Sequence, residues 1–341
     1  MTGTIKKFLL SASVIAGAGA IATSPASAIN ITSATLTGSA ATDFEVWDVG
    51  GTPGIDCPAT AASCLQSSGT NTSNIIGILD GTLASPGGNI ELFKSSEKLN
   101  LNDFKQYNKV TSLKTDFSDG TSVTFSSLTA KDLFGAGLDT SYGANTLATK
   151  WFDDAFEANL PSVLTAFGVG NEAALYTKLN QSIALANLLL PPNLKINPAD
   201  YTSRAALYNG FLNKGGFQRA VDPNIAFVNK IGNNVEYGLA GHANLLFYAP
   251  QAVQAILAQK GVTVQGSELI KLSYSGKDEI SYSFGCTPSN VASKDGSFNC
   301  TYAGDPAIVP PPTEKVPEPS VILGLLGVGG MFVATRKLKK S

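Results

Sequence analysis

The chain has 341 residues, of which 43% are hydrophobic and only 15% are charged. Globular domains usually carry about 25% charged residues, so the polarity of this chain comes from Ser, Thr and Asn. With 24 Lys and Arg against 26 Asp and Glu, the sequence offers no basic surface for nucleic acid, and its single histidine excludes metal centres built on several histidines. We therefore expect no nucleic-acid partner, no metal site and no cofactor.

The first 28 residues have the order of a secretory signal peptide. Lys6 and Lys7 precede an apolar run from Phe8 to Ile21, and the small residues Ala26-Ser27-Ala28 come next. Cleavage is expected after Ala28. The sequence therefore predicts a signal peptide at residues 1–28 and export of the chain beyond it.

Ser and Thr are frequent at both ends of the exported region, residues 29–302, and rare in its middle. We interpret the Ser/Thr-rich ends as β-structure and the middle as helical, which gives an α+β fold class. The length allows one domain or two, and a helical insert within one sheet domain is our preferred interpretation. Asp119-Gly120 is typical of a turn before a strand. The expected N-terminal strands lie near residues 31–38, 43–49, 75–80, 89–94 and 121–127.

The middle segment, about residues 146–260, predicts four amphipathic helices. Asn171 can cap the second helix, while Pro161 is expected to end the first and Pro191-Pro192 the second. None is long or basic enough to lie on a membrane surface, so we expect all four to pack into a core. They start near residues 147, 172, 203 and 250.

Apolar and polar residues alternate at residues 270–274 and again at 280–284, with a turn expected at Ser275–Asp278. Phe298, Cys300 and Tyr302 indicate a third strand. We therefore expect a C-terminal β-meander over about residues 268–302.

The four cysteines form two close pairs along the chain, Cys57 with Cys64 and Cys286 with Cys300. Four cysteines allow three disulfide connectivities, and export to an oxidising compartment favours their oxidation. We prefer the local pairing because each pair spans a loop that can fold back on itself. Neither pair has the Cys-x-x-Cys spacing of a zinc site.

The C-terminal end combines a proline-rich stretch, an apolar segment and a basic tail. Prolines concentrate in residues 303–319, which we interpret as an extended stalk. Residues 320–335 are uncharged and largely apolar, and as a helix they would measure about 24 Å, short of a bilayer core of roughly 30 Å. Cations in residues 336–341 favour a cytoplasmic tail. We therefore expect residues 320–335 to form a transmembrane helix that is barely long enough to span the bilayer, with the part of the chain before it outside the cytoplasm. These cations are Arg336, Lys337, Lys339 and Lys340.

The apolar segment is preceded by Val316-Pro317-Glu318-Pro319-Ser320. With the signal peptide, this Pro-Glu-Pro motif, the apolar segment and the basic tail resemble the PEP-CTERM sorting signal of Gram-negative bacteria. The resemblance covers only the C-terminal end. It implies that Pro317, Glu318 and Pro319 are recognised by an exosortase, a membrane-embedded cysteine transpeptidase that cuts near the motif. Such proteins typically accompany exopolysaccharide, and the central domain of many members has no assigned activity.

A hydrolytic function would depend on His242, which stands in a stretch of small residues. A catalytic triad needs a serine and a carboxylate beside it, but the chain has no Gly-x-Ser-x-Gly motif, so we favour a structural role for His242. Asp116 and Asp119 resemble a calcium loop only weakly, because the ligand spacing and terminal Glu of an EF-hand are absent.

Glycoside hydrolysis would be a natural activity for a protein beside polysaccharide, and it would need two carboxylates that face each other across the substrate. Asp153, Asp154 and Glu157 lie on one predicted helix, an arrangement more typical of a solvated face. Trp47 and Tyr142 could stack on sugars, although most aromatic side chains should lie in the core.

We therefore expect an exported, non-enzymatic protein of the cell surface or extracellular matrix. Signal peptidase and exosortase would process it, with an inner-membrane intermediate held by residues 320–335, and exopolysaccharide is a further expected partner. The alternatives are a secreted hydrolase or a sugar-binding protein that acts on matrix polysaccharide.

Overall fold

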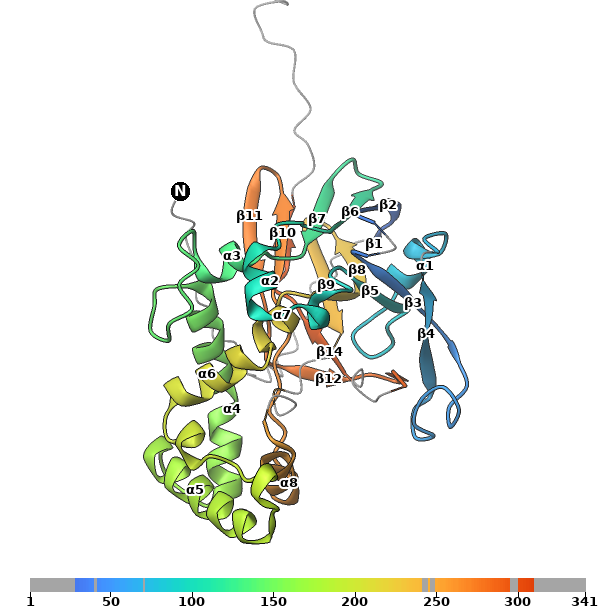
Figure 1. Ribbon diagram of the computed structural model, residues 1–341. Helices are drawn as coiled ribbons and strands as arrows, with labels where there is room; N and C mark the ends of the chain where they lie inside the picture. Colours follow the sequence, from blue (N-terminus) through green and yellow to red (C-terminus); the bar gives the residue numbers. More distant parts are fainter. Residues whose placement is uncertain are drawn as a thin grey trace, which may run out of the picture. The chain divides into compact units, whose positions relative to one another are not determined.

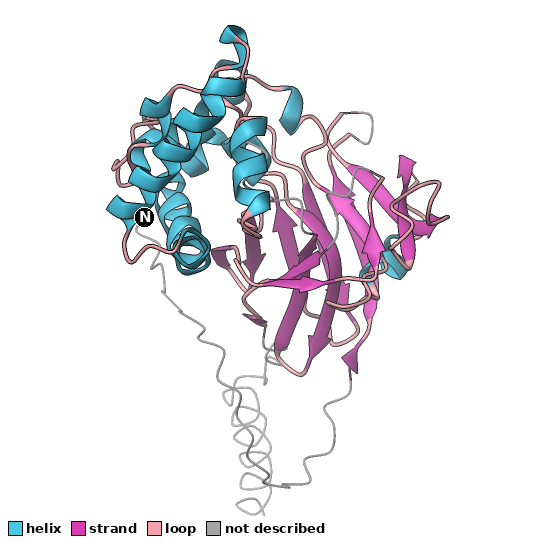
Figure 2. Ribbon diagram, turned by 90° about the horizontal axis from the view of Figure 1, so that it is seen from below, coloured by secondary structure: helices cyan, strands magenta, loops and turns pink. Residues whose placement is uncertain are grey.

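The computed structural model describes residues 28–39, 42–69, 71–240, 245, 249–294 and 300–309. Within these residues, two β-sheets face each other and a group of helices lies beside them (Figure 1). Figure 2 shows the long helices gathered on one side and the strands on the other. The mixed α+β fold class is therefore confirmed.

Ten strands form the larger sheet: β1 (Ala28–Ile29), β3 (Glu45–Gly51), β4 (Ser63–Gly69), β5 (Gly88–Glu91), β8 (Asn224–Ile231), β9 (Asn234–Ala240), β12 (Cys286–Pro288), β13 (Val291–Ala292), β14 (Cys300–Ala303) and β15 (Ala307–Ile308). Their order is β12-β14-β9-β8-β5-β3-β4-β13, with β1 paired to β8 and β15 to β9. The hairpin of β8 and β9 lies at the centre and turns at Gly232, whose φ of 58° favours glycine.

Five strands form the smaller sheet: β2 (Ile31–Thr37), β6 (Ser112–Phe117), β7 (Ser122–Ser126), β10 (Ile270–Tyr274) and β11 (Lys277–Ser281). Their order is β11-β10-β7-β6-β2. The predicted Asp119-Gly120 turn is confirmed between β6 and β7, where the backbone N–H of Thr121 donates to the Asp119 carboxylate at 3.1 Å. The predicted hairpin is also present, but its second strand, β11, spans Lys277–Ser281 instead of 280–284, because Ser275-Gly276 alone make the turn and Tyr274 already pairs with Lys277.

The main core lies between the two sheets. It combines side chains of the larger sheet, such as Val46 and Tyr237, with side chains of the smaller sheet, such as Phe125 and Leu272. The rings of Phe125 and Tyr237 meet edge to face, with centroids 5.3 Å apart. Apolar residues at alternate positions therefore hold the sheets together, as the period of a strand requires.

A buried lysine connects the same two sheets. Lys230 on β8 is only 1% exposed, and its ammonium group pairs with the Asp119 carboxylate in the β6–β7 turn and donates to Thr121 Oγ1 at 2.7 Å. Burial acts to raise the pKa of Asp119, but the hydrogen bonds from Lys230 and Thr121 hold that pKa below its ordinary value.

Four longer helices correspond to the predicted ones: α4 (Leu147–Phe167), α5 (Glu172–Leu189), α6 (Arg204–Asn213) and α8 (Gln251–Gln259). The shorter helices are α1 (Ile75–Leu79), α2 (Leu101–Gln106), α3 (Ala130–Phe134) and α7 (Gly216–Ala220), with 3-10 turns η1 (Ser96–Lys98), η2 (Pro192–Leu194) and η3 (Pro198–Tyr201). The predicted cap of α5 is confirmed, because Asn171 Oδ1 accepts the backbone N–H of Ala174 at 2.9 Å.

An aromatic cluster joins the helices to the sheets. The N-terminal half of α4 packs with α6 and α7, and the rings of Phe211 and Phe217 meet edge to face at 4.9 Å. Trp151 lies 6.2 Å from Phe217 and also contacts Phe284, which comes after β11. The first turns of α4 are therefore fixed by packing on both sides.

Pro161 does not end the first long helix, contrary to prediction. It lies inside α4, which continues to Phe167. A proline removes one backbone hydrogen bond from a helix interior. Here Val163 and Leu164 pack in an apolar cluster beyond the proline, and this burial offsets the lost hydrogen bond.

Two further predictions of local structure are wrong. Residues 75–80 form α1 instead of a strand, because the spacing of Ile75, Ile78 and Leu79 buries one face of a helix. The middle segment, residues 146–260, is not purely helical, since it contains β8 and β9. The helical interpretation rested on the low Ser and Thr content of this segment, and neither β8 nor β9 contains Ser or Thr.

The predicted β-meander over residues 268–302 is also wrong. β10 and β11 belong to the smaller sheet, whereas the third strand, β14, pairs with β9 and β12 in the larger sheet. Strand pairing depends on contacts distant in the sequence, which local alternation does not reveal.

The predicted stalk at residues 303–319 is wrong for its first part. Ala303 ends β14, and β15 pairs with β9 and buries Ala307, because pairing within the sheet satisfies the backbone that a stalk would leave to water. Residues 310–319 lie outside the described residues.

Both disulfides have the predicted local pairing. Cys57 bonds to Cys64 and Cys286 bonds to Cys300. The second bond links β12 to β14, which are already neighbours in the sheet. Each disulfide therefore closes a short loop at one edge of the larger sheet.

Candidate functional site

The C-terminal half of α4 and helices α5, α6 and α8 surround a cavity of about 570 Å³. Small-molecule sites usually measure about 300–1,000 Å³ and are lined mainly by apolar side chains. The wall of this cavity fits that description. Its apolar lining includes Phe156, Leu160, Val163, Leu179, Val253 and Leu257.

Residue spacing along the helices explains the apolar wall. Val163 and Phe167 lie four residues apart on α4, as do Leu175 and Leu179 on α5, and each pair lines the cavity. α4 ends at Gly168, whose φ of 63° is left-handed, and the chain enters α5 after residues 168–171. Both helices therefore present an apolar stripe to the same space.

Polar groups are few in the wall and concentrate at its exposed parts. The amide of Asn159 is satisfied, since it donates to two backbone carbonyls and accepts one backbone N–H at 2.8–2.9 Å. Burial raises the pKa of Tyr201 to about 12, so its hydroxyl is neutral at physiological pH. Lys195, Asp200 and Lys214 are exposed lining residues. The cavity can therefore hold an apolar molecule, with most of its polar groups at the exposed parts of its wall.

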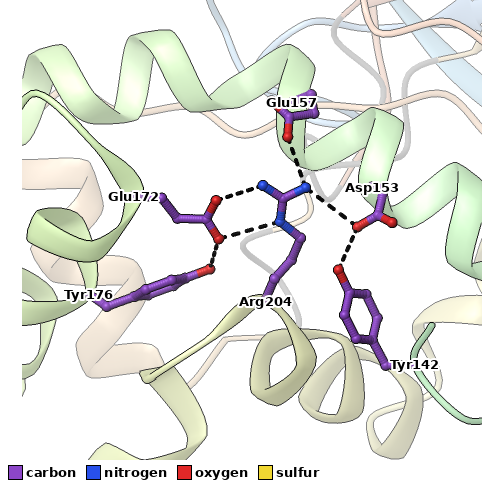
Figure 3. A network of polar contacts seen from close by, with 6 residues as sticks. All are labelled: Tyr142, Asp153, Glu157, Glu172, Tyr176 and Arg204. Carbon is purple, nitrogen blue, oxygen red and sulfur yellow. Dashed lines mark hydrogen bonds and ion pairs between the residues drawn. The ribbon is translucent and has the colours of Figure 1, made fainter.

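A network of polar contacts is centred on Arg204 (Figure 3), and its member Tyr176 also lines the cavity. Arg204, the first residue of α6, forms a bidentate contact with Glu172 on α5, at 2.6 Å and 3.3 Å. Its guanidinium also pairs with Glu157 at 2.8 Å and Asp153 at 3.6 Å, both on α4, and lies 4.3 Å from the ring centroid of Phe156. One arginine thus joins three helices.

Two tyrosines extend this network. Tyr176 donates to Glu172 at 2.5 Å, and Tyr142 donates to Asp153 at 2.8 Å. Hydrogen bonding by Arg204 lowers the pKa of Glu172, although burial opposes this. Burial, together with the Asp153 carboxylate, raises the pKa of Tyr142 to about 12. Glu172 is therefore ionised and both tyrosines are protonated at neutral pH. Tyr176 belongs to the cavity wall as well.

The predicted carboxylate cluster of α4 is present, but its members bind cations. Asp153 and Glu157 both contact Arg204. Asp154 pairs with Lys150 and accepts a hydrogen bond from Tyr282 at 2.7 Å. These carboxylates stabilise the helices, and they do not face each other across an open site as a glycosidase would require.

The other predicted candidates are also engaged in structural contacts. Asp116 pairs with Lys114 at 2.5 Å, and Asp119 pairs with Lys230. Among the described residues, no group of three or more His, Cys, Asp or Glu could hold a metal ion. The indole N–H of Trp47 donates to a glutamate on a neighbouring strand at 3.3 Å, and the Tyr142 hydroxyl is used by Asp153.

Several predicted residues lie outside the described residues. They are Ala26, His242, Pro317, Glu318, Pro319, Arg336, Lys337, Lys339 and Lys340. Ala28, the predicted cleavage residue, starts β1 and pairs with Ile231, so cleavage there would leave Ile29 as the first paired residue. No helix in the described part of the chain is long and apolar enough to cross a membrane, and the predicted segment at 320–335 is not in that part.

Sequence reasoning missed both the cavity and the role of Arg204. The only local signal for Arg204 is its place directly after Ser203, which caps α6 by accepting the backbone N–H of Ala206 at 3.2 Å. Its three carboxylate partners come from 32 to 51 residues away along the chain, so only the tertiary fold brings them together.

Comparisons of this chain with protein-family models, curated proteins and solved structures found no match. The function therefore has to be argued from the chemistry of the site.

Proposed function

We propose that this chain is an exported, non-catalytic protein of the cell surface or extracellular matrix that binds a small apolar molecule in its helical cavity. The observation that carries the proposal is the cavity of about 570 Å³ between α4, α5, α6 and α8. Apolar walls do not satisfy the hydrogen bonds of water, so such cavities favour apolar ligands.

The hydrophobic effect gives the expected driving force. Transfer of an apolar ligand from water contributes about 25 cal/mol for each Å² of apolar surface that is buried. A ligand with a polar end can place that end near Lys195, Asp200 or Lys214, which are the exposed lining residues. The expected ligand therefore has a hydrocarbon body and few polar atoms.

Export and sorting form the second part of the proposal. Two disulfides are consistent with an oxidising compartment outside the cytoplasm. The signal peptide at residues 1–28 and the PEP-CTERM resemblance at Pro317-Glu318-Pro319 support passage through an inner-membrane intermediate. Signal peptidase and an exosortase would process the chain, and the processed protein would lie among exopolysaccharide outside the cell.

A pair of matched variants tests the ligand site. Gly210 of α6 lines the cavity, and a Cβ built there meets no heavy atom within 4 Å. Gly210→Phe therefore places a ring into open space of the cavity without a clash at Cβ. Asn209→Phe adds the same side chain at the neighbouring exposed position, which does not line the cavity.

The assay is a fluorescence titration with the neutral probe N-phenyl-1-naphthylamine. We expect saturable binding to the wild type and to Asn209→Phe, and affinity at least tenfold weaker for Gly210→Phe. Circular dichroism and the melting temperature verify that both variants fold. Equal probe binding by the wild type and Gly210→Phe would refute the cavity as the ligand site.

Cell fractionation tests the sorting part. Cells expressing the wild type are compared with cells expressing a triple alanine variant of Pro317, Glu318 and Pro319. We expect the variant to accumulate in the membrane fraction at unprocessed mass. Unchanged processing and surface delivery would contradict the sorting proposal and leave the cavity proposal untouched.

A further inference from the structure

The C-terminal half of α5 and the turn after it expose an unusual number of large apolar side chains. Leu185 is 67% exposed, Leu188 80% and Leu189 88%, and Leu194 in η2 is 58% exposed. We call these four side chains the leucine face. Single exposed leucines are common, but a contiguous group on one helix marks an interaction surface.

The leucine face is separate from the packed face of the same helix. Leu175, Leu179 and Ile183 are buried, and they form the stripe that the sequence predicts to enter a core. Leu185, Leu188 and Leu189 have the three- and four-residue spacing of a second stripe. α5 is therefore apolar on two sides, and only one of them is covered within the described residues.

The turn after α5 is held firmly in place. The side-chain amide of Asn187 donates to the carbonyl of Ile196 and accepts its N–H, both at 2.8 Å. This double hydrogen bond anchors the loop that carries Leu194 beside the end of α5. Leu194 also lines the cavity, so the leucine face is continuous with the rim of the ligand site.

The part of the chain that carries the leucine face has no acidic residue. Residues 173–199 contain no Asp or Glu and include Lys178 and Lys195, both exposed. Neither lysine pairs with a carboxylate of the described residues. The nearest acidic residues along the chain are Glu172, which is bound by Arg204, and Asp200.

The sequence alone predicted that α5 is not basic enough to lie on a membrane surface and packs into a core, and the exposure of its leucines revises that prediction. We propose that the leucine face docks on the surface of an anionic lipid bilayer. Leucines on an exposed helix insert into the boundary of headgroups and acyl chains, while nearby lysines meet the anionic headgroups. Because residues 173–199 contain no carboxylate, anionic headgroups would be repelled there only by the neighbouring Asp200.

Charge argues against a second copy of the chain as the occupant. A two-fold dimer would place the same patch against itself and bring lysines of one sign together. Docking on lipid does not require the cavity to be filled. One consequence rests on the proposed function: lipid at the leucine face would lie at the cavity rim, from which an apolar ligand can enter past Leu194.

Quenching by brominated lipids tests the docking directly. Leu188→Trp places a reporter in the leucine face of the full-length protein, and Ile55→Trp places one at a 75% exposed position in the loop between β3 and β4. We expect vesicles of brominated phosphatidylglycerol to quench the emission of Leu188→Trp and to leave Ile55→Trp near the background of Trp47 and Trp151. Because quenching is local, an anchor elsewhere in the chain does not imitate this result.

Two comparisons complete the experiment. Brominated phosphatidylcholine should quench Leu188→Trp much less, and exchange of Leu185 and Leu189 for Ser in the Leu188→Trp protein should weaken vesicle affinity at least tenfold. Equal quenching of the two reporters, equal quenching by both lipids, or a dimer that shields Leu188→Trp from lipid would each overturn the proposal.

The same variants distinguish a failure of lipid docking from a failure of ligand binding in the cavity. The Leu185→Ser and Leu189→Ser exchanges should leave uptake of N-phenyl-1-naphthylamine unchanged, since neither residue lines the cavity. Gly210→Phe combined with Leu188→Trp should retain lipid quenching. Loss of lipid quenching with intact probe uptake overturns docking alone, and the reverse pattern overturns the ligand site alone.

Discussion

Replacement of Arg204 by methionine removes the cation that joins α4, α5 and α6. The side chains of its bidentate pair are partly buried, with Arg204 20% and Glu172 30% exposed. Loss of one partner from a fully buried pair costs about 3–5 kcal/mol, and exposed pairs contribute about 0–1 kcal/mol. The Arg204–Glu172 pair is partly buried, so its loss should cost about 2 kcal/mol of the free energy of unfolding, between these limits. Glu157 is 60% exposed, so its pair with Arg204 contributes little. We therefore expect Arg204→Met to lower the free energy of unfolding by about 2–3 kcal/mol.

Urea unfolding monitored by circular dichroism measures this loss. Lys178→Met removes an exposed cation from α5 and should change the free energy of unfolding by less than about 0.5 kcal/mol. A double-mutant cycle of Arg204→Met with Glu172→Gln should give a coupling energy of about 1–2 kcal/mol. A loss as small as that of the control, or a coupling energy near zero, would refute the assigned role of Arg204.

The same pair predicts a pH dependence. Hydrogen bonding by Arg204 lowers the pKa of Glu172 in the folded protein. Its stabilisation is therefore present above the unfolded-state pKa of Glu, about 4.3, and is lost as the pH falls through the lower folded value. Arg204→Met should consequently flatten the fall in stability below about pH 5. If the free energy of unfolding of Arg204→Met falls below pH 5 as steeply as that of the wild type, the prediction is contradicted.

Three other changes have defined outcomes. Gly210→Ala should raise the free energy of unfolding by about 0.5–1 kcal/mol in thermal or urea unfolding, because a helix-interior glycine gains a Cβ in open space. Asp119→Asn should destabilise the protein at pH 7 by several kcal/mol, since it leaves the buried Lys230 without its carboxylate, and the difference from wild type should shrink as the pH falls through the lowered pKa of Asp119. Replacement of Cys286 and Cys300 by Ala opens a loop of sequence separation 14 and should cost about 3 kcal/mol in the same assay.

Local signals in the sequence predicted the elements that depend on local physics. Helices α4, α5, α6 and α8 result from apolar spacing and from caps such as Asn171, and β10 results from the alternation of apolar and polar residues. The two disulfides agree with the short separations of their cysteines. These features need only contacts between residues close in the chain.

Features that depend on tertiary contacts were missed. Pro161 fails to end α4 because the apolar residues beyond it pack in a cluster, and β8 and β9 were interpreted as helical because neither contains Ser or Thr. Arg204 finds its partners through the packing of three helices, and the cavity exists only where four helices leave space. The exposure of Leu188 and Leu189 was not predicted either. Propensity and pattern carry no information on which apolar face is covered.

Methyl NMR of the purified protein during titration with 1-dodecanol tests the central claim, ligand binding in the helical cavity, most directly. The account predicts saturable shifts of the methyl signals of Val163, Val253 and Leu257, which line the cavity, and unchanged signals for Leu113 and Val123 in the core between the sheets. Absence of shifts at the cavity methyls, or equal shifts in both groups, would contradict it.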